Sequence, residues 1–365
     1  MRAIRFAHRW TGGFIGLMLL VLGLSGTLLA FKDDYLRLVF PPAREAPITD
    51  PIRMGAVVET IQKSLHQPRS VILATDGMGL HRVAYAERSQ GAYVSQWGEV
   101  LDTWTRLHHR PEVWLFELHH YLLAGDTGKA ICGIVGLAGM GFIITGIILW
   151  WPTRRMFSFQ LWPKVWTRFG IIKHHRDMGV WIAPLLALVI LTGCCLALKP
   201  MYNAVAQSFS NGQDPKTVMA APEVKGGPLP ADFDWAAAIA KAQRHFPDGE
   251  IRIIAFPRKP GDLISMRLRR AQEWLPNGRS QIWFDPATGQ ILQARDGVNL
   301  PTGLKMANSL YPLHAGKVWG LPYRLVVAAT GVGLTLLGSL AVATFWGNPR
   351  GVPKRRKKKL VTAKA

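Results

Sequence analysis

Six of the eleven histidines in this chain stand beside long apolar runs, where an imidazole is suited to chemistry. The segments HRWTG, which starts at His8, and HRDMG, which starts at His175, open two such runs with the same spacing of histidine, arginine and glycine. Neutral imidazole is the commonest metal ligand in proteins. The repeated pattern therefore suggests a site built from more than one histidine. The six are His8, His119, His120, His174, His175 and His314.

Four uncharged apolar stretches would position these histidines, and each is long enough for the roughly 20 residues that a membrane-spanning helix needs. They run from about Trp10 to Phe31, Ala130 to Trp151, Val180 to Leu198 and Leu325 to Trp346. The first is longer than the apolar core of a signal peptide and lacks a cleavage site, so we expect it to be retained. The predicted segments are 1–31 (span 1), 32–129 (outer domain 1), 130–151 (span 2), 152–179 (inner loop), 180–198 (span 3), 199–324 (outer domain 2), 325–346 (span 4) and 347–365 (basic tail).

The net charge of +21 follows the membrane topology. Residues 1–9, 152–179 and 347–365 carry 17 lysines and arginines against one acid, whereas the two long connections mix both signs. Such asymmetry places the basic segments, and with them both termini, in the cytoplasm. We expect the tail KRRKKK to meet anionic lipid, and we do not expect nucleic-acid binding.

The sequence contains an internal repeat. Residues 8–32 align with residues 175–199 at ten of 25 positions without gaps, ending in LSGTLLAFK and LTGCCLALK. Leu118–His119 precede Trp151 at the same distance as Leu313–His314 precede Trp346. Each half reads as span, outer domain, histidine and span, so the two repeats should be parallel in topology.

Each long connection predicts a small α+β domain. The first has helical spacing in PIRMGAVVETIQKSLH, followed by strand-like runs VILAT, HRVAYA and AYVSQWGEVL. The second has DFDWAAAIAKAQRHF as a helix with an aspartate cap, then the runs IRIIAF, LISMRLR, SQIWFD and ILQAR. DPATG, at residues 285–289, predicts a turn between the last two strands. The expected fold is thus a mainly α membrane protein with four spans in two parallel repeats and two outer α+β domains.

The topology pairs His8 with His175 at the inner ends of the spans and His119 with His314 at the outer ends. Two facing imidazoles suit a b-type haem with an axial ligand from each of two helices. Gly12 and Gly179, each four residues after the histidine, would leave room for the macrocycle. Arg9 and Arg176 would pair with haem propionates. The sequence alone leaves His174 and His120 open as alternative ligands.

The histidines and the glycines, each taken alone, have simpler interpretations. A single histidine at the start of a span is usually an interfacial polar residue, and small residues four apart usually pack helices. Four sites at repeat-equivalent positions favour ligation. A non-haem metal is less suited, because no cluster of Asp or Glu accompanies these histidines.

The segments HRWTGGFIGLMLLVLGLSGTLLAF, LHHYLLAGDTGK, TGIILWWPTRR, KHHRDMGVW and LHAG resemble the PepSY-associated transmembrane-helix family, and DPATGQI resembles the closing hairpin of the PepSY domain. The resemblance covers essentially the whole chain. It implies a bacterial inner-membrane ferric-siderophore reductase of the FoxB type with two haems. The family's histidines fall on His8, His119, His175 and His314, with His120 and His174 as extra neighbours.

We therefore expect an oxidoreductase that moves electrons outward to a periplasmic ferric siderophore and releases Fe(II). No dinucleotide or flavin motif is visible, so the donor would be a quinol or a separate cytoplasmic reductant. The sequence does not identify catalytic residues beyond the haem ligands. Two alternatives are a siderophore or iron permease without a redox role, and a membrane-anchored PepSY module that regulates periplasmic proteins. The permease finds little support, because the spans hold no charged residue at their centres.

Overall fold

The computed structural model describes residues 1–347, so the predicted lipid-binding run Lys354–Lys359 lies outside the described residues. The chain divides into two compact units. The first consists of Met1–Leu24, Val135–Leu191 and the described residues from Ala329 onward. The second consists of Ser25–Ile134 and Thr192–Ala328. Each unit is therefore assembled from segments that are far apart in the sequence.

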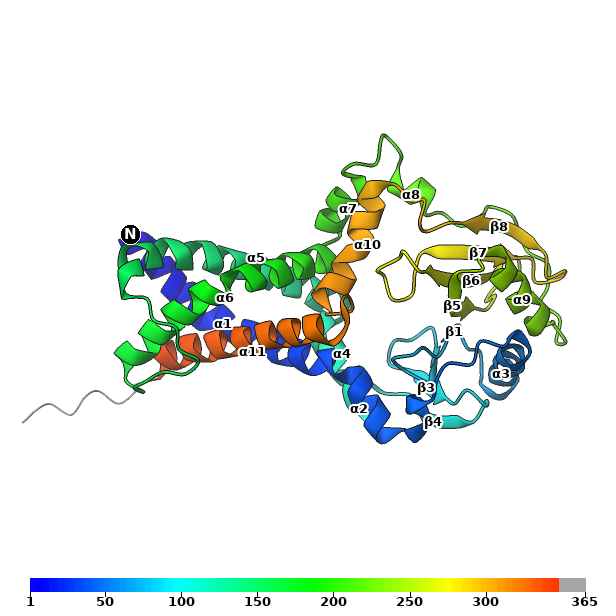
Figure 1. Cartoon of the computed structure of the whole chain (residues 1–365), viewed down its shortest axis with the longest axis horizontal. Helices are drawn as coiled ribbons and strands as arrows, with labels where there is room; N and C mark the ends of the chain where they lie inside the picture. Colours follow the sequence, from blue (N-terminus) through cyan, green and yellow to red (C-terminus); the bar gives the residue numbers. More distant parts are fainter. Residues whose placement is uncertain (348–365) are drawn as a thin grey trace, which may run out of the picture. The chain divides into compact units, whose positions relative to one another are not determined.

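Four helices within residues 1–347 are long and apolar enough to cross a membrane (Figure 1). They contain the predicted spans, but α6 begins at Arg168 rather than at Val180, because no proline interrupts the intervening chain. The second half of the predicted inner loop is therefore helical, and His174 and His175 lie inside a helix rather than ahead of it. The four are α1 (Arg2–Ala30), α5 (Gly125–Trp150), α6 (Arg168–Ala197) and α11 (Gly320–Trp346).

Glycines bring α1 and α11 into close contact within the first unit. A Cβ added to Gly23 would lie 2.8 Å from the carbonyl oxygen of Gly331, and one added to Gly338 would lie 2.6 Å from that of Gly16. Small residues let membrane helices approach until their backbones touch. Gly16, on the histidine-bearing face of α1, therefore packs helices.

The outer histidines lie on short helices ahead of two spans. His119 and His120 are in α4 and His314 ends α10. Left-handed residues, Leu122 (φ 45°) and Gly125 (φ 58°) among them, separate α4 from α5. The short helices are α2 (Lys32–Val39), α4 (Pro111–Tyr121), α7 (Lys199–Gln207), α8 (Pro215–Val218) and α10 (Thr302–His314), with 3-10 turns at η1 (Pro41–Arg44), η2 (Leu107–His109) and, in the first unit, η3 (Trp151–Met156).

The two long connections share one antiparallel sheet of eight strands among the described residues, in the order β4-β3-β2-β1-β5-β6-β7-β8. Strand β1 of the first connection pairs with β5 of the second, with Val71 opposite Ile254. The structure thus differs from the predicted pair of separate domains, because joining the two meanders removes two exposed strand edges. The strands are β1 (Ser70–Ile72), β2 (His81–Ala84), β3 (Gly91–Val94), β4 (Val100–Trp104), β5 (Gly249–Ala255), β6 (Ile264–Arg270), β7 (Ser280–Phe284) and β8 (Ile291–Arg295).

Two helices pack against the sheet, α3 (Pro51–Ser64) and α9 (Trp235–His245). They touch each other closely, since a Cβ on Gly55 would lie 2.6 Å from the backbone nitrogen of Ala236. In β6, Ile264, Met266 and Leu268 are fully buried and alternate with more exposed residues, as a half-buried strand requires. One hydrophobic core therefore serves both connections.

A helix cap and a turn that the sequence predicts are both present in the structure. Asp234 caps α9 by accepting a hydrogen bond from the Ala237 backbone N–H at 2.8 Å, as predicted for this helix. The turn between β7 and β8 closes with Gly289 at φ 61°, and the Gly289 N–H donates to the Asp285 carbonyl at 2.8 Å.

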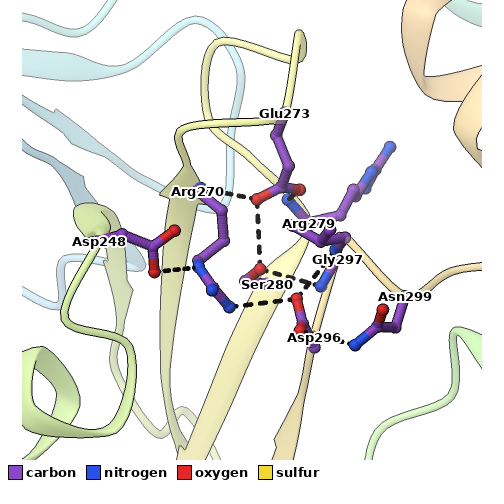
Figure 2. Close-up of polar contacts among 9 residues, drawn as sticks. Asp248, Arg270, Glu273, Arg279, Ser280, Asp296, Gly297 and Asn299 are labelled. Carbon is purple, nitrogen blue, oxygen red and sulfur yellow. Dashed lines mark hydrogen bonds and ion pairs between the residues drawn. The ribbon is translucent and has the colours of Figure 1, made fainter.

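A network of hydrogen bonds and ion pairs connects the β6–β7 connection to the end of β8 (Figure 2). The Glu273 carboxylate accepts from the Arg270 backbone N–H at 2.8 Å and from the Ser280 hydroxyl at 3.2 Å. The Gly297 N–H donates to the same hydroxyl oxygen at 2.9 Å. The Arg270 guanidinium also pairs with Asp296 at 3.3 Å. These bonds satisfy polar groups at the rim of the core and hold three strands in register.

Candidate functional site

The structure brings the predicted histidines together in two pairs. His8 on α1 and His175 on α6 face each other in the first unit, with ring centroids 6.5 Å apart and ring planes at 83°. His119 on α4 and His314 on α10 face each other in the second unit, with centroids 6.1 Å apart and planes at 41°. Each unit therefore contains one facing pair.

Both separations fit one metal ion between the rings. A metal–imidazole bond is about 2 Å long and the nitrogen lies about 1 Å from the ring centre, so a bis-histidine ion needs centroids about 6 Å apart. No group of three or more His, Cys, Asp or Glu side chains suited to a metal occurs among the described residues. A haem needs two axial protein ligands, since its macrocycle supplies the other four nitrogens. The donor sets therefore fit haem better than a bare ion.

In three of the four rings, Nδ1 lies within hydrogen-bonding distance of a hydroxyl group. The Nδ1 atom lies 2.7 Å from the Thr145 hydroxyl for His8, 3.0 Å from the Ser25 hydroxyl for His119, and 3.3 Å from the Thr192 hydroxyl for His314. Metal-bound histidines usually hold their second nitrogen in this way, which fixes the ring orientation. If these rings bind a metal, Nδ1 would keep its hydroxyl partner and Nε2 would be the ligand atom.

For His8 the hydrogen bonds also define the tautomer. The Thr145 hydroxyl donates its single proton to the Gly141 carbonyl at 2.7 Å. Toward His8 it can therefore only accept, so the proton of the neutral imidazole must sit on Nδ1. The lone pair of Nε2 is then available to a metal.

Glycines make room for the two outer rings. A Cβ on Gly26 would lie 2.8 Å from Cε1 of His119, and a Cβ on Gly193 would lie 2.8 Å from Cε1 of His314. Each glycine directly follows the residue whose hydroxyl meets the same ring. Ser25, Gly26, Thr192 and Gly193 were not among the site residues predicted from the sequence. The matching motifs LSGT and LTGC of the repeat were the signal that could have identified them.

The glycines near the inner pair lie at ordinary contact distance from neighbouring side chains. A Cβ on Gly12 would meet its nearest neighbour, Phe142, at 4.0 Å, and one on Gly179 would meet Leu337 at 3.7 Å. Both positions would accept a methyl group, but Phe142 and Leu337 pack beside them, so the structure does not show the predicted room for a macrocycle at these glycines. Nδ1 of His175 is buried without a hydrogen-bond partner among the described residues, which leaves this imidazole incompletely satisfied in the protein alone.

The alternative ligands point elsewhere. Successive residues of a helix project about 100° apart, so His174 cannot face His8 together with His175. His120 stacks on Phe116, with centroids 3.9 Å apart, and its Nδ1 lies 3.0 Å from the Phe116 carbonyl oxygen. Burial lowers the pKa of His120 to about 4. The geometry favours His175 and His119 in the facing pairs.

The two arginines predicted to pair with propionates differ in their surroundings. Arg9 is exposed, and its guanidinium carbon lies 5.9 Å from the centre of the Phe345 ring. The Arg176 guanidinium donates to the buried carboxylate of Asp177 at 2.7 Å and to the Met156 carbonyl at 3.3 Å. Arg176 is therefore already held by two protein acceptors, whereas Arg9 extends toward solvent.

His81 on β2 is a further histidine removed from solvent, with 4% of its area exposed. Its Nδ1 accepts a hydrogen bond from the Ala74 backbone N–H at 3.0 Å. Burial lowers the pKa of His81 to about 4. The β2 strand turns this side chain inward, so His81 is a structural residue rather than a surface one.

The chain was compared with known protein families and with curated proteins. Residues 5–347 match the family described as the PepSY-associated TM region. No curated protein gives a significant match. The match spans nearly the whole chain and includes the four apolar helices and both histidine pairs. The chain is a membrane protein that belongs to the PepSY-associated TM region family.

Proposed function

We propose that this protein is a di-haem reductase of the bacterial inner membrane that passes electrons from a quinol or a cytoplasmic reductant to a ferric siderophore in the periplasm. The observation that carries the proposal is the presence of two facing histidine pairs with centroids 6.5 Å and 6.1 Å apart, one in each compact unit. A purely structural role would not require two separate pairs of facing imidazoles.

Four side chains would hold the two haems. His8 and His175 would bind the inner one, and His119 and His314 the outer one. A bound b-type haem supplies an iron that changes its charge by one electron. The protein contributes the orientation of three of the rings, through Thr145, Ser25 and Thr192, and room for the outer rings at Gly26 and Gly193. Hydrogen bonds to the second ring nitrogen also raise the basicity of the ligands and tune the metal.

The proposed substrate follows from the chemistry of iron complexes. Siderophores bind Fe(III) through hard oxygen donors much more tightly than Fe(II), so one electron releases the metal. Residues 199–324 of the outer region carry 16 lysines and arginines against 10 acidic residues, and this positive charge would favour an anionic complex.

The orientation is part of the proposal. The basic segments 1–9 and 152–179 would face the cytoplasm with both termini, and the eight-stranded sheet would face the periplasm. The first unit would then contain the inner haem and the second unit the outer haem.

Reduction by reconstituted protein tests this function. Full-length protein in vesicles would receive a reduced quinone analogue, with a ferric trihydroxamate siderophore on the outer side and a coloured Fe(II) chelator beside it. We expect Fe(II) to form with the wild type and with the exposed-histidine variant His66→Ala, and at least tenfold more slowly with His119→Ala and with His175→Ala. Equal rates in all four proteins would refute the proposal.

A further inference from the structure

The first unit contains a small cavity that the histidine pair does not use. The segment after η3 folds back on the start of α6 and encloses about 230 Å³. Most ligand sites are larger, about 300–1,000 Å³, so this cavity suits a single ring or head group. Its lining includes Lys164, Val165, Phe169, Lys173, His174 and Asp177.

His174 is the unsatisfied group of this cavity. Only 4% of its area is exposed, and neither ring nitrogen has a hydrogen-bond partner among the described residues. Burying a polar group without a partner costs about 1–3 kcal/mol, so such groups usually meet a ligand or water. Asp177, 3% exposed, lies on the same side of α6 and is already paired with Arg176 at 2.7 Å.

Exposed aromatic residues lie in and near the segment that lines the cavity. Phe169, which lines it, is 73% exposed. Trp162 and Trp166, which flank the lining residues Lys164 and Val165 in the sequence, are 63% and 64% exposed. Exposed aromatic side chains together with basic residues such as Arg154 and Arg155 are typical of the membrane–water interface. A lipid-soluble molecule could therefore reach the cavity from the bilayer.

We propose that this cavity binds the head group of a membrane quinol, with His174 as its hydrogen-bonding partner. A neutral imidazole has one donor and one acceptor nitrogen, and a hydroquinone hydroxyl both donates and accepts. The phosphate of a lipid only accepts, so it would leave one nitrogen of His174 unpaired, and it would also lie beside the Asp177 carboxylate. The quinol therefore matches the cavity better than a lipid head group does.

The inference rests on the proposed function and names its electron donor. One quinol becomes a quinone as it loses two electrons and two protons. The two electrons reduce the Fe(III) of two siderophore complexes, one electron each, to Fe(II), and the two protons pass to water at the membrane surface. His174 and His175 are adjacent on α6, so the same helix presents one imidazole to the cavity and the other to His8.

Binding of decylubiquinol to the dithionite-reduced full-length protein in zwitterionic lipid nanodiscs, measured by calorimetry without oxygen, tests the assignment. We expect His174→Leu to weaken binding about tenfold, because it removes both hydrogen-bonding nitrogens. His174→Gln keeps one donor and one acceptor and should bind within about threefold of the wild type. The exposed control His66→Leu should bind as the wild type does. Unchanged binding in His174→Leu would overturn the inference.

Two further measurements distinguish this inference from its alternatives. His174→Leu should retain the wild-type haem content, and loss of one haem would mean that His174 is an axial ligand and not a quinone partner. If Lys164→Gln weakened binding of anionic lipid while decylubiquinol bound independently of His174, the cavity would be a lipid site and the inference would fail. A wild-type protein without haem would refute the proposed function, whereas the binding of decylubiquinol would still be decided by the His174 variants.

Discussion

At the scale of single residues, hydroxyl groups lie beside Nδ1 of three of the four paired histidines. Thr145 donates to the Gly141 carbonyl and so accepts from His8, which leaves Nε2 of His8 unprotonated. The Ser25 and Thr192 hydroxyls lie 3.0 Å and 3.3 Å from Nδ1 of His119 and His314. Ser25 and Thr192 occupy equivalent positions of the sequence repeat, whereas Nδ1 of His175 has no such partner among the described residues.

Replacement of Thr145 by valine tests this orientation. Thr145→Val removes the acceptor for Nδ1 of His8, and loss of such a partner typically weakens metal binding about 10–100-fold. Titration of haem into the stripped protein should show weaker binding at one of two sites. Thr344→Val is the matched control, because Thr344 also donates to a backbone carbonyl, that of Leu340 at 2.8 Å. Equal losses in both variants would contradict this role of Thr145.

The glycines beneath the outer rings give a second prediction. Gly26→Ala and Gly193→Ala would each place a methyl group 2.8 Å from Cε1 of an outer histidine, so the ring must move. We expect each variant to lose the outer haem and to keep the inner one, as counted by the haem content of purified protein. Gly141→Ala, where nothing lies within 4 Å of the added carbon, should retain both. Full retention in the first two variants would show that the rings tolerate displacement.

His81 makes the sheet sensitive to acid. Burial lowers its pKa to about 4 in the folded protein, against 6.5 for an unperturbed histidine. The unfolded chain therefore takes up the proton at a higher pH than the folded protein does. The contribution of neutral His81 to the free energy of unfolding is fully present above about pH 6.5. It falls as the pH drops toward 4, by up to about 3 kcal/mol. The midpoint of thermal unfolding, followed by tryptophan fluorescence, should fall less steeply over this range in His81→Gln than in the wild type or in His66→Gln. Parallel slopes in all three would exclude His81 as the cause.

At the scale of elements, the two outer connections depend on each other. Strands β1 and β5 pair across them, and α3 packs on α9 over one core. The hydrophobic core around α3 and α9 therefore contains residues of both connections. The close approach at Gly55 is the point where the two helices are most sensitive to added volume.

A substitution at Gly55 tests this joint core. Gly55→Ala would place its Cβ 2.6 Å from the Ala236 backbone and force α3 away from α9. Overpacking of this kind costs about 1–3 kcal/mol, so the thermal midpoint should fall measurably. Gly77→Ala is the control, because the nearest atom to its added carbon, the Thr75 hydroxyl oxygen, lies at 3.8 Å. A midpoint unchanged in Gly55→Ala would argue against tight contact.

Much of this architecture could be predicted from local patterns, and the rest depends on pairing between distant segments. Hydropathy identified the four long helices, and turn chemistry identified the Asp285–Gly289 turn. The pattern of the run AYVSQWGEVL did not show that it splits into β3 and β4 around a turn at Gly98. The union of β1 with β5 could not be predicted, because backbone pairing at strand edges leaves no signal in side-chain type.

The candidate site, too, could be predicted from the sequence only in part. The repeat and the topology predicted which histidines would face each other. The alternatives His174 and His120 could be separated from His175 and His119 only by the rotation of each helix and by the contact of His120 with Phe116. Ser25 and Thr192 were visible in the repeat, but their role depends on a distance to an imidazole about a hundred residues away in the chain.

At the scale of the whole molecule, one facing histidine pair lies in each compact unit. A protein that only anchors an outer domain has no need of either pair, and a permease would need a polar path through its spans. Two pairs suited to haem instead match a protein that accepts electrons on one side of a membrane and delivers them on the other. The central claim is therefore the presence of two bis-histidine haems.

An absorption spectrum of the purified full-length protein, recorded with and without dithionite and combined with haem quantification, tests that claim most directly. We predict two b-type haems per chain with a six-coordinate ferrous spectrum. We also predict one haem per chain in His175→Ala, with the outer site intact. A wild-type protein that binds no haem, or a His175→Ala variant that retains both haems, would contradict this account.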